Sequence, residues 1–212
     1  MSDVNQLLSR IDAEFAGLES RVKAQQNARI EQYHEREKRV EQFEQLLGQL
    51  RDIWRPRLEA LAQRFGDRVK VSPSVAPGSR QATFQFQSPL ARVNLRFAAS
   101  TDTDVTKLVV SYDLDILPIL MQFEKHAEVT YPIDRVDHDA LAQWLDDRIV
   151  TFVKTYLALH ENEYYLKDFM VEDPVAHVRF PKFAAGAKLE RDGKTLYFVS
   201  EETRQEFEKQ KG

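Results

Sequence analysis

Residues 84–97, FQFQSPLARVNLRF, alternate apolar and polar side chains on both sides of a Ser-Pro turn. The same alternation returns in KLVVSYDLDI, residues 107–116. A period of two is that of a β-strand with one buried and one solvated face. Val69 and Val71 alternate before this stretch, and we expect a fifth strand within residues 119–131. The pattern predicts an antiparallel sheet of four or five strands.

Downstream of the sheet, residues 138–160 change to a helical period. Asp137 stands one position before them, where a carboxylate caps a helix N-terminus. The apolar positions of this helix are Leu141, Trp144, Leu145, Ile149, Phe152, Val153, Tyr156 and Leu157. One long helix packed on the sheet makes residues 67–165 an α+β domain, and α+β is the fold class that we expect for the whole chain.

Upstream of the sheet, residues 1–55 contain no proline and carry an apolar stripe at coiled-coil spacing. The stripe consists of Val4, Leu8, Ile11, Phe15, Leu18 and Val22, and then Val40, Phe43, Leu47, Leu50 and Trp54. These positions predict an N-terminal helical rod whose seam meets a partner helix, either of a second copy or of another protein. We expect Pro56 to end or kink the rod, with residues 56–66 as a short connecting helix.

An alternative explanation places the same stripe inside the molecule. Gly17, or the polar segment of residues 23–39, could divide the rod into two helices. Two shorter helices could then pack on their own domain, and their apolar stripe would need no partner.

The composition excludes several classes of function. The net charge is −4 and no segment clusters Lys and Arg, so we expect no nucleic-acid binding. The chain has no cysteine, which excludes disulfides, thiolate metal sites and a cysteine nucleophile. No apolar run approaches the ~18 residues of a membrane span, and the first residues are neither basic nor followed by an apolar run, so we expect no signal peptide. We therefore expect a cytoplasmic protein without a membrane partner.

Acidic residues and two histidines are the only candidates for a polar site in the globular part of the chain. His126 follows the predicted fourth strand, and His177 lies in the C-terminal segment. Most of the acidic residues fall on the solvated faces of the predicted strands and helix. The sequence also has no metal-binding loop, no zinc-protease motif and no nucleophile elbow. We predict no catalytic and no cofactor-binding residue, and we expect no cofactor.

Residues 166–212 are expected to form a separate module. Asp192-Gly193 lies between two apolar runs, which indicates a tight β-hairpin. Ser200 follows the second run and is suited to cap a short helix that begins with two glutamates. A hairpin and a helix of this size need a metal or a neighbouring surface for stability.

This module resembles the YHS domain, a short metal-associated module of the TRASH-like group. The resemblance covers about 40 residues and rests on the turn, the aromatic strand and the spacing between them. The matching residues are Asp173-Pro174-Val175, Asp192-Gly193-Lys194, Tyr197-Phe198, Ser200-Glu201 and Phe207.

The departures from the family pattern fall on its metal ligands. Ala176, Val199 and Thr203 stand at the three positions where the family keeps cysteines. Because these side chains cannot replace thiolates, we expect no metal here. The resemblance then implies a module kept for its shape and docked on the central domain. We expect Phe198 and Val199 to pack where the metal would lie, and the docking surface to be Phe169, Met170, Phe180 and Phe183.

Three classes of function remain open. The first is a non-catalytic interaction or scaffolding protein that self-associates or captures a partner through its N-terminal helix. The second is a small-molecule binder or enzyme with a cleft between the sheet and the C-terminal module, near His126 or His177. The third is a metal-handling or sensing protein.

Overall fold

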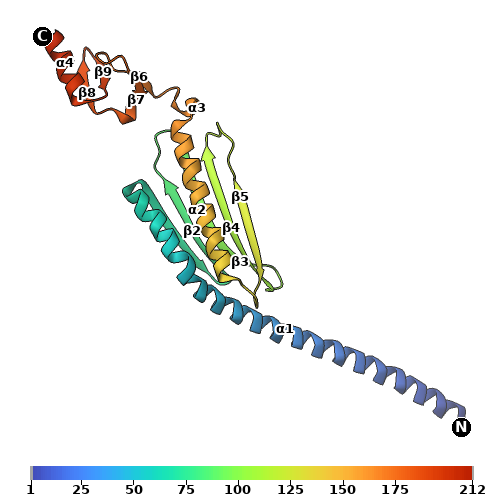
Figure 1. Ribbon diagram of the computed structural model, residues 1–212. Coiled ribbons are helices and arrows are strands. Elements are labelled where there is room, and N and C mark those ends of the chain that lie inside the picture. Colours follow the sequence, from blue (N-terminus) through green and yellow to red (C-terminus); the bar gives the residue numbers. More distant parts are fainter. Residues whose placement is uncertain (1, 212) are drawn as a thin grey trace.

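The computed structural model describes residues 2–211, and it confirms the α+β class (Figure 1). Five antiparallel strands form one meander in the order β1-β2-β3-β4-β5. Their bounds are β1 Val69–Ala76, β2 Ser79–Phe86, β3 Arg92–Thr101, β4 Lys107–Leu117 and β5 His126–Pro132. The fifth strand therefore begins within the expected segment. Along β3 and β4 every second side chain is buried, as the alternation predicts.

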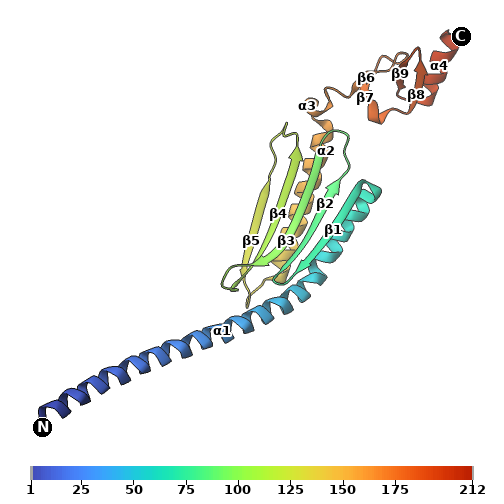
Figure 2. The same cartoon turned by 180° about the vertical axis from the view of Figure 1, so that it is seen from behind.

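Two helices, not one, cover the apolar face of the sheet. They are the second half of α1, Ser2–Phe65, and the whole of α2, His138–Glu161. Figure 2 shows the opposite face of the sheet free of helices. The physical reason is width: five strands spaced ~4.8 Å apart span roughly 20 Å, and a helix of ~10 Å covers only half of that.

Aromatic side chains join the two helices to the sheet. Phe86 of β2 lies 4.6 Å from Phe65 of α1 and 4.5 Å from Phe152 of α2, measured between ring centroids. Tyr156 of α2 meets Phe65 edge-on at 5.0 Å. The predicted cap also forms, since the Asp137 carboxylate accepts a hydrogen bond from the Ala140 N–H at 2.9 Å. These contacts place α2 as expected, except that Leu157 is exposed.

The second half of the predicted seam is part of the central core. Phe43, Leu47 and Leu50 are buried against the sheet, and Trp54 packs at the edge of the same core. For these four residues the interpretation as a partner-helix seam is wrong, because the sheet of their own chain occupies that face. Val40, three residues before Phe43, is 44% exposed.

Helix α1 continues through Pro56, which was expected to end or kink it, and the helix ends at Phe65. Leu58, Leu61 and Phe65 extend the buried stripe beyond the proline. Their packing on the sheet stabilises the helical conformation that proline alone disfavours. The expected units 1–55 and 56–66 are thus not separate, because residues 2–65 form one helix.

The C-terminal module begins beyond α2 and the short helix α3, Glu163–Leu166. The expected hairpin and helix are β8 Ala187–Arg191, β9 Lys194–Phe198 and α4 Glu201–Lys211. Asp192 and Gly193, with φ of 53° and 73°, form the predicted turn. A small additional hairpin, β6 Met170–Glu172 with β7 Arg179–Pro181, was not expected.

The module stands at the end of the central domain and does not cover a face of the sheet (Figure 1). The connection is narrow: Phe169, at the edge of the central core, contacts the ring of Phe183, with 6.1 Å between centroids. Phe180 is buried, and Val199 is 36% exposed. The module instead has a core of its own, where the rings of Phe198 and Phe207 lie 5.5 Å apart.

Candidate functional site

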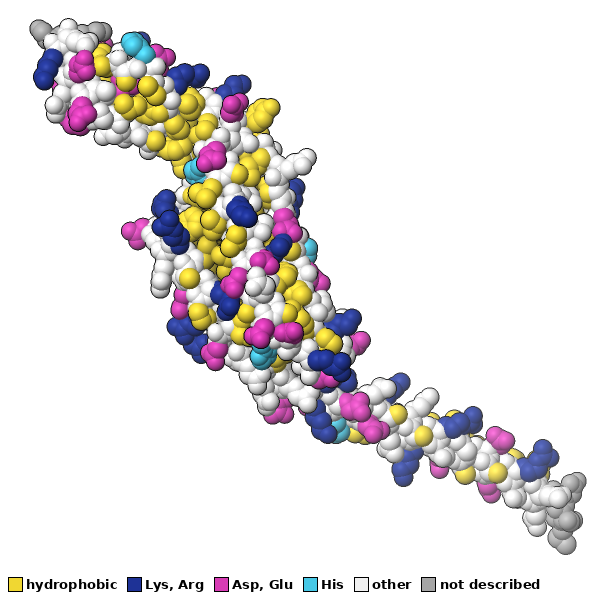
Figure 3. Space-filling view, viewed as in Figure 1, with side chains coloured by type: hydrophobic (Ala, Val, Ile, Leu, Met, Phe, Trp, Pro, Cys, Tyr) yellow, Lys and Arg dark blue, Asp and Glu magenta, His cyan; other side chains and the backbone are white. Residues whose placement is uncertain are grey.

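The first half of α1 leaves the central domain and carries the remaining half of the seam. We call residues 2–42 the projecting segment, and Val4, Leu8, Ile11, Phe15, Leu18 and Val22 the N-terminal seam. All six side chains of the N-terminal seam are between 41% and 63% exposed, and every residue from Val4 to Lys38 is exposed. Figure 3 shows the apolar side chains of the projecting segment as separate patches among charged ones. The N-terminal seam is the strongest candidate interaction surface in the described residues.

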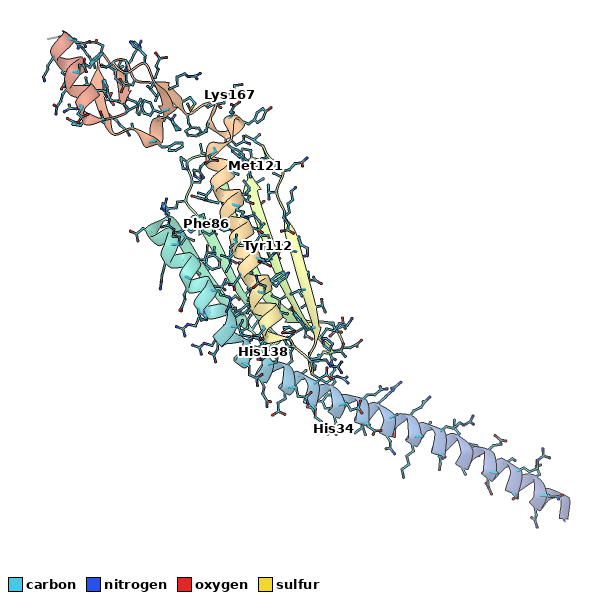
Figure 4. All side chains as sticks on the ribbon, in the orientation of Figure 1. His34, Phe86, Tyr112, Met121, His138 and Lys167 are labelled. Carbon is cyan, nitrogen blue, oxygen red and sulfur yellow. The ribbon has the colours of Figure 1, made fainter. Side chains whose placement is uncertain are left out.

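Most polar contacts along the middle of the projecting segment are local to the helix, although Arg36 donates to the Thr103 carbonyl of the central domain at 3.5 Å. The Tyr33 hydroxyl donates to Glu37 at 2.8 Å, and His34, labelled in Figure 4, lies 3.3 Å from the same carboxylate. The hydrogen bond from Tyr33, helped by His34, lowers the pKa of Glu37. A hollow of about 430 Å³ lies beside this stretch, but residues of a single helix line it. With one wall, such a hollow does not enclose a ligand.

Two ion pairs hold the second half of α1 on the central domain and so fix the direction of the projecting segment. Glu44 accepts from the Gly78 N–H at 2.5 Å and from Arg80 at 2.7 Å, and these bonds lower its pKa. Arg57 donates to Asp146 of α2 at 2.8 Å. Each anchor joins α1 to a different part of the domain, the β1–β2 hairpin in one case and α2 in the other.

The C-terminal module is organised round the carboxylate of Asp173, which is fully buried. One oxygen, Oδ1, accepts from the N–H groups of Val175 and Ala176 at 2.8 and 3.0 Å. The other, Oδ2, accepts from the Val199 N–H and the Thr203 hydroxyl, both at 2.8 Å. Burial alone would raise the pKa of Asp173, but the four hydrogen bonds outweigh it and the pKa is lowered.

Ala176, which is near Asp173 along the chain, and Val199 and Thr203, which are far from it, therefore meet at one carboxylate. Ala176 and Val199 donate their backbone N–H groups to Asp173, and Thr203 donates its hydroxyl. These groups do not suit a metal ion. The backbone N–H groups are donors with no lone pair to offer a cation, and the Thr203 hydroxyl already donates to Asp173. Among the described residues, no three His, Asp or Glu side chains come close enough to hold a metal ion.

The two histidine candidates lie in different units and do not form one site. His177 is exposed, with its side chain 3.4 Å from Glu172. His126 lies on the open face of the sheet, where its Nδ1 is 2.8 Å from Asp113. Burial tends to raise the pKa of Asp113, but hydrogen bonds with His126 and Arg96 outweigh it and lower that pKa. This arrangement is a surface ion-pair network.

The sequence did not predict the unpaired hydroxyl of one buried tyrosine. Tyr112 of β4 is fully buried, and its hydroxyl has no hydrogen-bond partner among the described residues. Figure 4 shows it beneath α2. Burial, with the nearby charge of Glu124, raises its pKa. Its position in the alternation of β4 identified it as a core residue, and nothing in the sequence marked the hydroxyl as unpaired.

Comparison with known proteins gives no relative: no protein family, curated protein or solved structure matches this chain. None of the helices within residues 2–211 combines the length and the apolar character that a membrane crossing requires.

Proposed function

We propose that this protein is a non-catalytic interaction or scaffolding protein that self-associates through the N-terminal seam. The observation that carries the proposal is the exposure of six regularly spaced apolar side chains on a helix that extends past its own domain. Coiled-coil spacing is a pattern that a second helix buries. Nothing else in the described residues covers this stripe, since the first buried residue of α1 is Phe43.

The anchoring of α1 supports a structural role for the projecting segment. Glu44 and Arg57 hold the second half of the helix, so the first half continues as a rigid extension and not as a tether. A helix of about 40 residues reaches roughly 60 Å at 1.5 Å per residue. An extension of this length and composition presents an interface at a distance from the globular part.

The C-terminal module belongs to the same proposal as a YHS-like module that is retained for its shape. The convergence of Ala176, Val199 and Thr203 on Asp173 supports this reading. A buried carboxylate with four donors gives the module internal cross-links, which a small core requires. The absence of cysteine from the chain supports a cytoplasmic setting for this protein.

Light scattering on the full chain tests the proposed function. We expect the wild-type protein to have at least twice the 24.7 kDa mass of one chain at tens of micromolar. Ile11→Glu places a charge in the N-terminal seam and should give a monomer. Ala13→Glu is the matched control, because it makes the same change in charge on the opposite side of the helix. A monomeric wild-type protein, or an unchanged mass in Ile11→Glu, would overturn the proposal.

A further inference from the structure

We infer that two copies of this chain pair through the N-terminal seam as antiparallel helices, with their globular parts at opposite ends. The inference rests on the proposed self-association and adds its orientation. The spacing of the N-terminal seam, 4-3-4-3-4, reads the same in both directions. A reversed second copy therefore aligns Val4 with Val22, Leu8 with Leu18 and Ile11 with Phe15. All six side chains are buried in one register, as alternating layers of an antiparallel coiled coil.

The position of the sheet favours this orientation over a parallel one. Ile11 and Leu47 are 36 residues apart, which is about ten turns at 3.6 residues per turn, so they share one side of α1. Leu47 packs on the sheet of its own chain. A parallel partner on the side of Ile11 would therefore run toward that sheet, and the two helices would have to separate before residue 43.

The extent of the apolar stripe agrees with the antiparallel register. In that register residue 2 of one copy lies opposite residue 24 of the other, so the overlap ends just after Val22. Residues 25–38, which are polar except for Ala28, Ile30 and Tyr33, then remain in water. A parallel pair would align this polar stretch with itself, where it offers little apolar surface to bury.

The charges that flank the N-terminal seam do not distinguish the orientations. Glu14 would face Glu19 of the second copy in a parallel pair and the second copy's Glu14 in an antiparallel pair. The orientation is therefore set by shape, that is, by where the sheet lies and where the apolar stripe ends.

The antiparallel pair has a defined span. Its two-fold axis lies near residue 13, and Phe43, the first residue of the core, is 30 residues away. At ~1.5 Å per residue the two central domains are held about 90 Å apart. The dimer would present two C-terminal modules at its far ends and act as a spacer between whatever the two ends contact.

Disulfide trapping in the full chain tests the orientation, because introduced cysteines would be its only thiols. In the antiparallel pair Leu8 of one copy meets Leu18 of the other, whereas Leu8 is ~15 Å along the axis from its own counterpart. A disulfide needs Cα atoms within ~7 Å. An oxidised mixture of Leu8→Cys and Leu18→Cys, one of them tagged, should give the mixed dimer at several-fold higher yield than either variant alone. Ala13→Cys, on the outer side, is the control that should not cross-link.

A distance measurement covers the case in which no disulfide forms. A spin label on Asn27→Cys, exposed and outside the overlap, should lie about 40 Å or more from its counterpart in the antiparallel dimer. Cross-linking of Leu8→Cys with itself, or a label distance below about 30 Å, would overturn the antiparallel orientation while leaving self-association intact. A monomeric wild-type protein in light scattering would remove the proposed function itself.

Discussion

The carboxylate of Asp173 shows how one buried residue can organise a small module. It links the loop after β6 to the end of β9 and to the start of α4 through four hydrogen bonds. Hydrogen bonds to an ionised acceptor are stronger than neutral ones. The module therefore has a charged centre held by its own N–H and O–H groups.

Replacing this carboxylate with an amide should destabilise the module. In Asp173→Asn one of the two oxygens becomes an NH₂ group, which faces the Val199 N–H or the Thr203 hydroxyl as a second donor. We expect a loss of about 2 kcal/mol in the unfolding free energy of the module. Hydrogen exchange of residues 195–205 measures this locally. Asp168→Asn, at an exposed position, is the matched control, and equal exchange in both variants would contradict the role given to Asp173.

The same residue predicts a dependence on acid. Because the pKa of Asp173 is lowered in the folded chain, its stabilising effect is fully present above its ordinary pKa near ~4. The effect is lost as the pH falls through the lower, folded-state pKa. The difference in stability between wild-type protein and Asp173→Asn should therefore shrink between pH 5 and about pH 2. Denaturant titrations across this range would refute the prediction if the difference stayed constant.

At the scale of one element, α1 uses one pattern for two purposes. Both halves of its apolar stripe have the same spacing, yet Leu47 is 2% exposed and Leu8 is 52% exposed. The buried half packs on the part of the apolar sheet face that α2 does not reach. The exposed half has no surface of its own chain within reach and is left to meet another helix.

Matched substitutions distinguish the role of the buried half of α1 from the role of its exposed half. Leu47→Ala removes a buried side chain, and we expect it to lower the unfolding free energy of the central domain by about 3 kcal/mol. Leu8→Ala is the same chemical change at an exposed position. It should leave that free energy unchanged and weaken self-association instead. Thermal melting and light scattering on both variants measure the two effects, and a destabilised Leu8→Ala would contradict this division.

At the scale of the whole molecule, the chain is an elongated arrangement of the projecting segment, the central domain and the C-terminal module (Figure 1). The described structure has one main core, and the module at its far end has a small separate one. Because Val4 to Lys38 are all exposed, the central domain gains no buried apolar surface from them.

Two deletions test this division of the chain. A protein without residues 1–35 keeps every residue that the structure describes as buried, so we expect an unchanged melting temperature and the mass of a monomer. A protein without residues 1–55 loses Phe43, Leu47 and Leu50 from the core and should not fold. If the longer deletion melted like the full chain, the assignment of these residues to the core would be wrong.

The sequence by itself determined the features that depend on near neighbours. The alternation of β3 and β4, the Asp137 cap and the Asp192-Gly193 turn each follow from a few adjacent residues, and each was found where it was expected. Local periodicity also identified α1 as a long helix with an apolar stripe. Such a pattern states that a face is buried but not what buries it.

Only the tertiary structure decided what each face meets. The sheet is too wide for α2 to cover alone, so the uncovered part of the sheet buries Phe43 and Leu47 of α1. Helix α1 continues past Pro56 because its packing on the sheet outweighs the low helix propensity of proline. In the same way, the sequence shows Asp173 but not the groups that its carboxylate meets. Its donors Val199 and Thr203 lie 26 and 30 residues away, and only the folded chain brings them to its carboxylate.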